Sequence, residues 1–393
     1  MSSSSLLLAE IFERSSAQED VRTFSHAPGT RVLVERGGLA SLGKEAASLG
    51  ERAMIVTDPG IVAAGYVHRA QAILEESGLA VSIFSEVHEN PSTADVRRAV
   101  RHAQDSRADI LIGLGGGSSI DAAKGCNFIL SNGGEMKDYW GHEKATKSML
   151  PLIAIPTTAG TGSECQSYAL IADEKTHRKM ACGDKKAAAR VAILDPELTL
   201  SQPTKVTAVT AIDALSHAVE SYVSKPANSI SRAYALAGFE LMRDAIVTIH
   251  RDPRDLLGRA RMQVGAALAG TAIENSMLGA AHSMANPLTA NAGIIHGQAV
   301  GVALPVVIRR NACEDATIAQ DYRRLMPGEQ SLDSWFVERL QDFNLQVSLS
   351  RLGLDRSLIP KMATEAAEQW TAQFNPVAVD AAGFEQLYEE IWA

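Results

Sequence analysis

The chain has 393 residues, of which 46% are apolar and 21% charged, with 37 basic against 46 acidic side chains. This composition is typical of a soluble globular protein, and the length is sufficient for two domains. The net charge of −9 and the 5% of aromatic residues argue against a nucleic-acid-binding surface, which needs a basic footprint. No apolar stretch approaches the ~20 residues that span a bilayer.

Short β-branched runs alternate with longer amphipathic stretches through the first half of the chain. Strands are predicted at residues 31–35, 53–57, 81–84, 109–114 and 152–155, with two more candidates at 168–172 and 190–194. Helices are predicted between them at 60–76, 93–104 and 119–130. This alternation predicts a mostly parallel, Rossmann-like sheet covered by helices.

The character of the sequence changes after Asp195-Pro196. Helical periodicity dominates residues 207–223, 231–249, 258–274 and 331–345, and strand-like runs become scarce. The turn residues Ser201-Gln202-Pro203-Thr204 suggest a boundary near Gln202. The sequence therefore predicts an α/β domain over residues 1–202 and an all-helical domain over 203–393.

The N-terminus and the cysteines bear on cellular location. Residues 1–10 contain four serines and Leu6-Leu7-Leu8-Ala9 without a basic segment, which indicates a frayed tail rather than a signal peptide. The cysteines are widely spaced, which favours free thiols in a reducing compartment over disulfides or a thiolate metal site. They are Cys126, Cys165, Cys182 and Cys313. We therefore expect a cytoplasmic protein that binds no membrane.

A glycine loop, residues 115–119, follows the predicted strand 109–114 and precedes a helix. Its sequence is Gly115-Gly116-Gly117-Ser118-Ser119. Glycines allow a close approach of the backbone to a ligand, and a helix N-terminus offers free N–H groups, a combination that suits a pyrophosphate. A plain turn capped by Ser118 or Ser119 is the alternative. The loop is neither a Walker loop nor a complete Gly-x-Gly-x-x-Gly fingerprint.

Two further segments end predicted strands of the same sheet. Asp58 follows strand 53–57, where a carboxylate can hold ribose hydroxyls and repel a 2′-phosphate, or can simply cap the next helix. The threonine loop, residues 156–164, follows strand 152–155 and is rich in hydroxyls and small residues. Ligands bind at this end of parallel strands in open α/β sheets.

The helical half contains two groups of residues that could bind a metal. Asp213 and His217 are four residues apart and therefore share a helix face, among apolar neighbours. His282 and His296 lie in a second apolar stretch. One aspartate and three histidines would form a ligand set for Fe(II) or Zn(II), whereas an Asp–His ion pair in a helical core would explain the first pair alone. The spacing does not establish that the two groups meet.

Together these motifs resemble the iron-containing (group III) alcohol dehydrogenase family, over roughly residues 24–393. The resemblance implies a dinucleotide-binding α/β domain and a helical domain of the dehydroquinate synthase-like fold, with the active site in the cleft between them. It implies homo-oligomers, either dimers or larger assemblies. It places the metal ligands on Asp213, His217, His282 and His296. The cofactor contacts implied by the family are Asp58, Asn90, Gly116, Gly117, Ser118, Asp121, Thr157, Thr158, Thr161, Leu170 and Lys179.

One position departs from the family pattern. Members commonly have a histidine four residues after the first histidine of the second group, where this chain has Asn286. Asparagine can orient a substrate or a water molecule by hydrogen bonding but does not titrate near neutral pH. The departure therefore affects the route of proton release.

The resemblance implies reversible hydride transfer between a primary alcohol, or its aldehyde, and NAD(H), which we expect to be preferred over NADP(H). The bound metal, iron or zinc, would act as a Lewis acid on the substrate oxygen. One alternative is an NAD-using lyase of the dehydroquinate-synthase type. Such sites need several basic residues, and none lies within residues 213–217 or 282–296. Another is a mononuclear Fe(II) oxygenase, which would leave the glycine loop unexplained.

Overall fold

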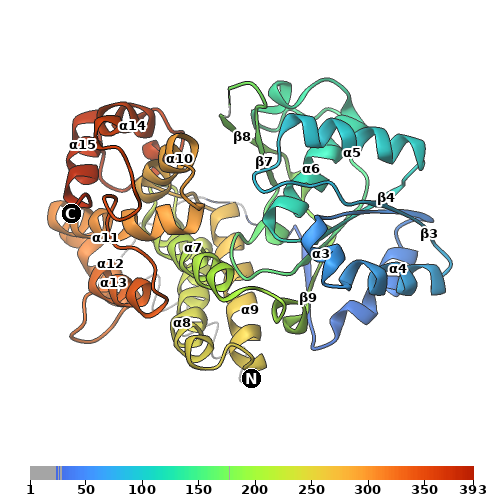
Figure 1. Ribbon diagram of the computed structural model, residues 1–393, viewed down its shortest axis with the longest axis horizontal. Coiled ribbons are helices and arrows are strands. Elements are labelled where there is room, and N and C mark those ends of the chain that lie inside the picture. The colour runs from blue at the N-terminus through green and yellow to red at the C-terminus, as the bar shows by residue number, and fades with distance from the viewer. Residues whose placement is uncertain (1–23, 25, 27–28, 177) are drawn as a thin grey trace. The chain divides into compact units, whose positions relative to one another are not determined.

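The computed structural model describes Phe24, His26 and residues 29–176 and 178–393 (Figure 1). The predicted tail at residues 1–10 lies outside this part. The described residues form two compact units. The α/β unit ends at Gln202, and the helical unit comprises Pro203–Ala393 together with Phe24 and His26. His26 Nδ1 lies 2.9 Å from Asn275 Oδ1 of the helical unit.

A six-stranded, wholly parallel sheet forms the centre of the α/β unit, in the order β1-β9-β6-β4-β2-β3. Its middle strands are buried throughout because helices cover both faces, so they consist of continuous apolar residues. The predicted parallel α/β fold is thus confirmed. The strands are β1 (Arg31–Val34), β2 (Arg52–Val56), β3 (Ala80–Phe84), β4 (Ile110–Gly115), β6 (Leu152–Pro156) and β9 (Val191–Leu194).

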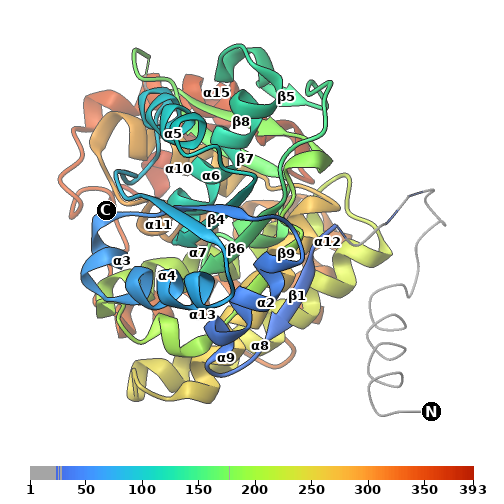
Figure 2. The same cartoon turned by 90° about the vertical axis from the view of Figure 1, so that its right-hand side faces the viewer.

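Helices pack on both faces of this sheet (Figure 2). Each face has its own hydrophobic core. Because side chains alternate along a strand, Met54 of β2 packs with α5 and α6 on one face, whereas Ile55 packs with α2 and α4 on the other. The helices are α2 (Leu42–Ala47), α3 (Pro59–Ala63), α4 (Tyr66–Glu76), α5 (Thr93–Asp105) and α6 (Gly117–Asn132).

Three details of the α/β unit differ from the predicted elements. The helix predicted over residues 60–76 is divided into α3 and α4 by Gly65, whose φ of 81° is left-handed and interrupts a helix. The strand predicted at residues 168–172, β7 (Tyr168–Ala172), belongs to a second sheet with β5 (Gly141–His142) and β8 (Lys179–Gly183). β7 and β8 are antiparallel. β8 was not predicted, because Lys-Met-Ala-Cys-Gly has few residues that favour strands.

The helical unit contains no strand among its described residues, which confirms the prediction for the second half. Helix α7 is buried almost throughout between Thr207 and Val223, as expected of a helix that other helices surround. None of the described helices combines the length and apolarity that crossing a membrane requires. The helices are α7 (Thr204–Val223), α8 (Ser229–Arg251), α9 (Leu256–Glu274), α10 (Ala280–Ala292), α11 (His296–Glu314), α12 (Ala316–Leu325), α13 (Leu332–Asp342), α14 (Ile359–Ala367) and α15 (Ala381–Glu390).

Candidate metal centre and nucleotide loops

One face of α7 presents Asp213, His217 and Glu220 to the interior of the helical unit. These residues are spaced by four and three positions, so their side chains line one stripe of the helix. All three are buried. A buried carboxylate or imidazole is stable only when it is paired, hydrogen-bonded or bound to a metal.

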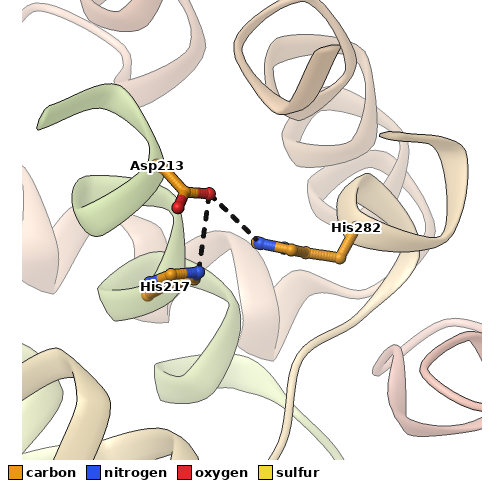
Figure 3. Close-up of side chains that lie close together, drawn as sticks. All are labelled: Asp213, His217 and His282. Atoms are coloured by element: carbon orange, nitrogen blue, oxygen red, sulfur yellow. Dashed lines mark ion pairs between the residues drawn. The ribbon is translucent and has the colours of Figure 1, made fainter. Parts of the chain in front are cut away.

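Helix α10 brings His282 to this stripe (Figure 3), and helix α11 brings His296. His217 Nε2 and His282 Nε2 lie 3.5 and 3.6 Å from Asp213 Oδ1, and ligand atoms of these three residues all lie within 4.8 Å of one another. His296, the first residue of α11, places Nε2 3.9 Å from the same oxygen. The structure therefore brings together all four residues that the sequence analysis selected as metal ligands.

Glu220 orients His282. One oxygen of the Glu220 carboxylate contacts His282 Nδ1, and the other accepts a hydrogen bond of 2.8 Å from the backbone N–H of Ala281. This arrangement turns His282 Nε2 toward Asp213. Glu220 is not among the residues predicted from the sequence, although its position three residues after His217, on the same helix face, is a signal that could have identified it.

The polar atoms at the centre of this group fit a bound cation. Asp213 Oδ1 and His282 Nε2 are buried and have no hydrogen-bond partner among the described residues. One carboxylate oxygen with imidazole nitrogens around it is a donor set that Fe(II) and Zn(II) accept. The group thus has the chemistry of a divalent metal centre.

The electrostatics of the group also favour a positive charge. Burial raises the pKa of Asp213, but the surrounding imidazoles outweigh burial and hold it well below its usual range. Burial lowers the pKa of His282, and the carboxylates of Glu220 and Asp213 more than reverse this effect and raise it to about 9. Two buried carboxylates therefore create a negative potential, which a metal cation would neutralise.

Asn286 lies one helical turn after His282 on α10. Its Nδ2 donates a hydrogen bond of 3.0 Å to Gln369 Oε1, and both side chains are partly exposed. The pair contains two neutral amides. Gln369 is distant in sequence from Asn286, and no motif in the chain identifies it.

In the α/β unit, the glycine loop has a distinctive backbone. Gly115 adopts a φ of 151°, and Gly116 is the N-cap of α6, with no side chain bonded to the helix N-terminus. The alternative turn, in which Ser118 or Ser119 caps the helix, is therefore wrong. The first N–H groups of α6 have no side-chain cap, a feature typical of anion-binding helix ends.

The threonine loop packs directly against the glycine loop. A Cβ atom added to Gly117 would lie 2.6 Å from the side chain of Thr161, and one added to Gly116 would lie 3.4 Å from Thr158. Thr157 donates its backbone N–H to the Gly115 carbonyl over 2.9 Å. The structure thus brings together five of the predicted cofactor contacts, Gly116, Gly117, Thr157, Thr158 and Thr161. A sixth, Ser118, comes directly after Gly117 in the first turn of α6.

Asp58 joins this group through its side chain. Asp58 Oδ1 accepts hydrogen bonds from the N–H groups of Gly60 and Ile61, so the residue caps α3. Asp58 Oδ2 accepts a hydrogen bond of 3.2 Å from Ser119 Oγ. The capping interpretation is therefore confirmed, and the contact with ribose stays a prediction.

The remaining predicted cofactor contacts lie around the second sheet. Leu170 is on β7 and Lys179 begins β8. Asn90, with a φ of 54°, lies in the loop between β3 and α5. The carbonyl of the next residue, Pro91, accepts a hydrogen bond from the N–H of Ala172, the residue paired with Lys179. The side chain of Asp121 points inward, where it accepts hydrogen bonds from Ser163 Oγ and the Leu170 N–H.

Comparison with known proteins places these features in one family. Residues 29–196 match the model described as iron-containing alcohol dehydrogenase, and residues 207–392 match the Fe-containing alcohol dehydrogenase family, C-terminal. Alcohol dehydrogenase 4 of Saccharomyces cerevisiae is 39% identical over 66% of this chain and 68% of its own length. The NAD-dependent methanol dehydrogenase of Bacillus methanolicus is 34% identical over 71% of this chain and 74% of its own. The solved structure of a 1,3-propanediol oxidoreductase superposes with a TM-score of 0.90 at 29% identity, covering 94% of this chain and 100% of that one.

Proposed function

This chain belongs to the iron-containing alcohol dehydrogenase family, and we propose that it interconverts a primary alcohol and its aldehyde with NAD(H) as the hydride carrier. The family consists of oxidoreductases that act on CH–OH donors, and NAD-dependent enzymes are among the relatives. The observation on which the proposal depends most is the group of Asp213, His217, His282 and His296 around one buried carboxylate oxygen.

We propose that these four side chains hold Fe(II) or Zn(II). When bound, the metal supplies a Lewis acid that stabilises negative charge on the substrate oxygen. Asp213 provides the anionic ligand, and Glu220 keeps the Nε2 lone pair of His282 directed toward the metal position. His296 is the most exposed of the four, with 26% of its side chain accessible. We therefore expect substrate to approach from the side of His296.

We propose that the α/β domain, which the sequence analysis bounded at residues 1–202, binds the dinucleotide, and that residues 203–393 hold the metal. The uncapped N-terminus of α6 supports a pyrophosphate at Gly116, Gly117 and Ser118. The carboxylate of Asp58, at the end of β2, would bind the adenosine ribose and repel the 2′-phosphate of NADP(H).

Proton release is proposed to depend on water rather than on a titrating side chain at position 286. Asn286 can accept a hydrogen bond through Oδ1 while its Nδ2 is held by Gln369. It would therefore orient the substrate or a water molecule, which completes proton transfer to solvent.

We also propose that the protein is a homo-oligomer and that it is located in the cytoplasm. A homo-oligomer is supported by exposed apolar residues, Val34 on the edge strand β1 and Leu257 at the start of α9. A cytoplasmic location is supported by the four cysteines, which are free thiols in the structure. Light scattering of the purified protein and fractionation of the source cells would test them.

The decisive experiment is a panel of alcohols, aldehydes and hydroxy acids, assayed with NADH and NADPH after reconstitution with iron or zinc. Net NADH oxidation by an aldehyde supports the proposal. A lyase would show no net NADH turnover, and an oxygenase would consume oxygen. His282→Ala should lose both the metal and the aldehyde reduction, and survival of both would rule out the assigned metal site.

A further inference from the structure

The α/β unit contains a fully buried lysine that the proposed function does not use. Lys124, in the second turn of α6, has no exposed surface. Its ammonium donates hydrogen bonds to the Ser163 carbonyl over 2.6 Å, to Ser163 Oγ over 2.9 Å and to the Tyr168 carbonyl over 2.9 Å. Three oxygens thus match the three donor hydrogens of the ammonium group.

Asp121, one turn earlier on the same helix, attaches to the same segment. Its Oδ1 accepts a hydrogen bond of 2.5 Å from Ser163 Oγ, and its Oδ2 accepts one of 3.3 Å from the Leu170 N–H. Lys124 Nζ lies 4.0 Å from Asp121 Oδ1. One turn of α6 therefore holds residues 163–170 through a pair of opposite, buried charges.

The segment held in this way continues directly into the threonine loop. The backbone N–H of Ser163 donates a hydrogen bond of 3.3 Å to Thr161 Oγ1. Thr161 in turn packs against Gly117 so closely that a methyl group there would overlap with it. A continuous series of contacts thus leads from Lys124 through Ser163 and Thr161 to the glycine loop.

We infer that Lys124 is a positioning residue for the dinucleotide, which sets the spacing between the threonine loop and the glycine loop without touching the cofactor. This inference rests on the proposed binding of NAD(H) at these loops. Burying an ammonium group is unfavourable, and methionine, which is apolar and one atom shorter than lysine, would avoid this desolvation. It would, however, leave three buried oxygens without a donor, and residues 161–163 would then move away from α6.

The test uses Lys124→Met in the full-length, metal-loaded protein, with NADH binding followed by fluorescence titration. The dissociation constant and the KM for NADH should rise by about tenfold or more, because even a small displacement of binding groups strongly weakens their interaction with the ligand. The kcat at saturating NADH should stay within about threefold of the original, and the metal content should not change.

Asn127 provides a matched control on the same helix. It is also fully buried, and its side chain exchanges two hydrogen bonds with the backbone of Leu150, outside the threonine loop. Asn127→Ala also removes buried hydrogen bonds, so it should lower thermal stability but leave the affinity for NADH unchanged.

The outcomes separate the inference from its premise. The inference is wrong if folded Lys124→Met binds NADH like the original protein, or if Asn127→Ala weakens binding equally. If Lys124→Met does not fold, Ser163→Ala replaces it, because it removes only the hydroxyl that bridges Lys124 and Asp121. That variant should weaken NADH binding severalfold, and an unchanged affinity would refute the inference. Failure of the original protein to bind NADH would instead refute the proposed function.

Discussion

Glu220 holds Nδ1 of His282, and the other nitrogen of that imidazole lies 3.6 Å from Asp213 Oδ1. The contact therefore determines which nitrogen of His282 can accept a metal, since the nitrogen that carries the proton cannot be a ligand. It joins α7 to α10 at the centre of the proposed metal site. A carboxylate that fixes a ligating histidine in this way also raises the basicity of the ligand.

Replacing Glu220 by glutamine should weaken metal binding without removing a ligand. The amide can donate to Nδ1 and so favour the tautomer whose Nε2 carries the proton. We expect a loss of about 10- to 100-fold in metal affinity, as for other partners of ligating histidines. Competition with a chelator, read by metal analysis of the protein, measures the change.

Glu220→Asp is a useful comparison, because it keeps the charge but shortens the side chain. His282→Ala marks the effect of losing a ligand altogether. If Glu220→Gln retained the original affinity for iron and zinc, the carboxylate would serve only to stabilise the packing of α7 against α10.

The proposed metal ligands could be selected from the sequence because each is a histidine or aspartate in an apolar stretch and because the motifs around them resemble those of a known family. The pairing of Asp213 with His217 follows from the helical period, whereas their meeting with His282 and His296 depends on the packing of α7, α10 and α11. Glu220 was overlooked because an acid on a helix usually faces solvent.

In the α/β unit, the roles of Lys124 and Gly65 could likewise not be predicted from the sequence. A lysine is almost never fully buried unless it is paired, and its partners Ser163 and Tyr168 follow some forty residues later in the chain. Gly65 interrupts a stretch whose apolar spacing is helical on both sides, so periodicity alone joins α3 to α4. The strand β8 is stabilised by pairing with β7 rather than by its own residue preferences.

Asp58→Asn should relax the preference for NADH over NADPH. The substitution removes the negative charge that would repel a 2′-phosphate, and asparagine is as good an N-cap as aspartate. Asp58 caps α3 through Oδ1 and accepts a hydrogen bond from Ser119 at Oδ2. In the variant the amide oxygen can keep the cap, and the amide Nδ2 can donate to Ser119 Oγ in the reverse direction, so the substitution isolates the effect of charge. We expect the ratio of kcat/KM for NADPH to that for NADH to rise about tenfold.

Asp58→Ala is the control, since it removes the cap as well and should cost about 1 kcal/mol of stability. If the ratio of kcat/KM for NADPH to that for NADH were unchanged in both variants, Asp58 would serve only to cap α3 and to hold Ser119.

Asn286→His should introduce a titrating group one turn from His282. Histidine has a pKa near 6.5 when unperturbed, whereas the amide of Asn286 does not titrate. In the variant, kcat should therefore change with pH near neutrality, and the original protein should lack this change. Steady-state rates of aldehyde reduction between pH 5 and 9, at saturating NADH, would measure it. Superimposable profiles would place residue 286 outside the route of the proton.

Glu164, in the threonine loop, should make the stability of the protein depend on pH. Burial raises the pKa of its carboxyl from 4.5 to about 7, although the nearby Lys124 ammonium opposes the rise. The folded protein thus keeps a proton that the unfolded chain releases above pH 4.5. The resulting stabilisation is complete below that pH and is lost as pH rises toward 7, at up to about 1.4 kcal/mol per pH unit.

The measurement compares chemical denaturation of the original protein and Glu164→Gln at pH 5 and pH 8. Glutamine imitates the protonated carboxyl and cannot ionise, so the variant lacks this dependence. Relative to the variant, the original protein should lose up to about 3 kcal/mol of unfolding free energy between the two pH values. Parallel losses in both proteins would mean that Glu164 is already ionised in the folded state, with Lys124 as its counter-ion.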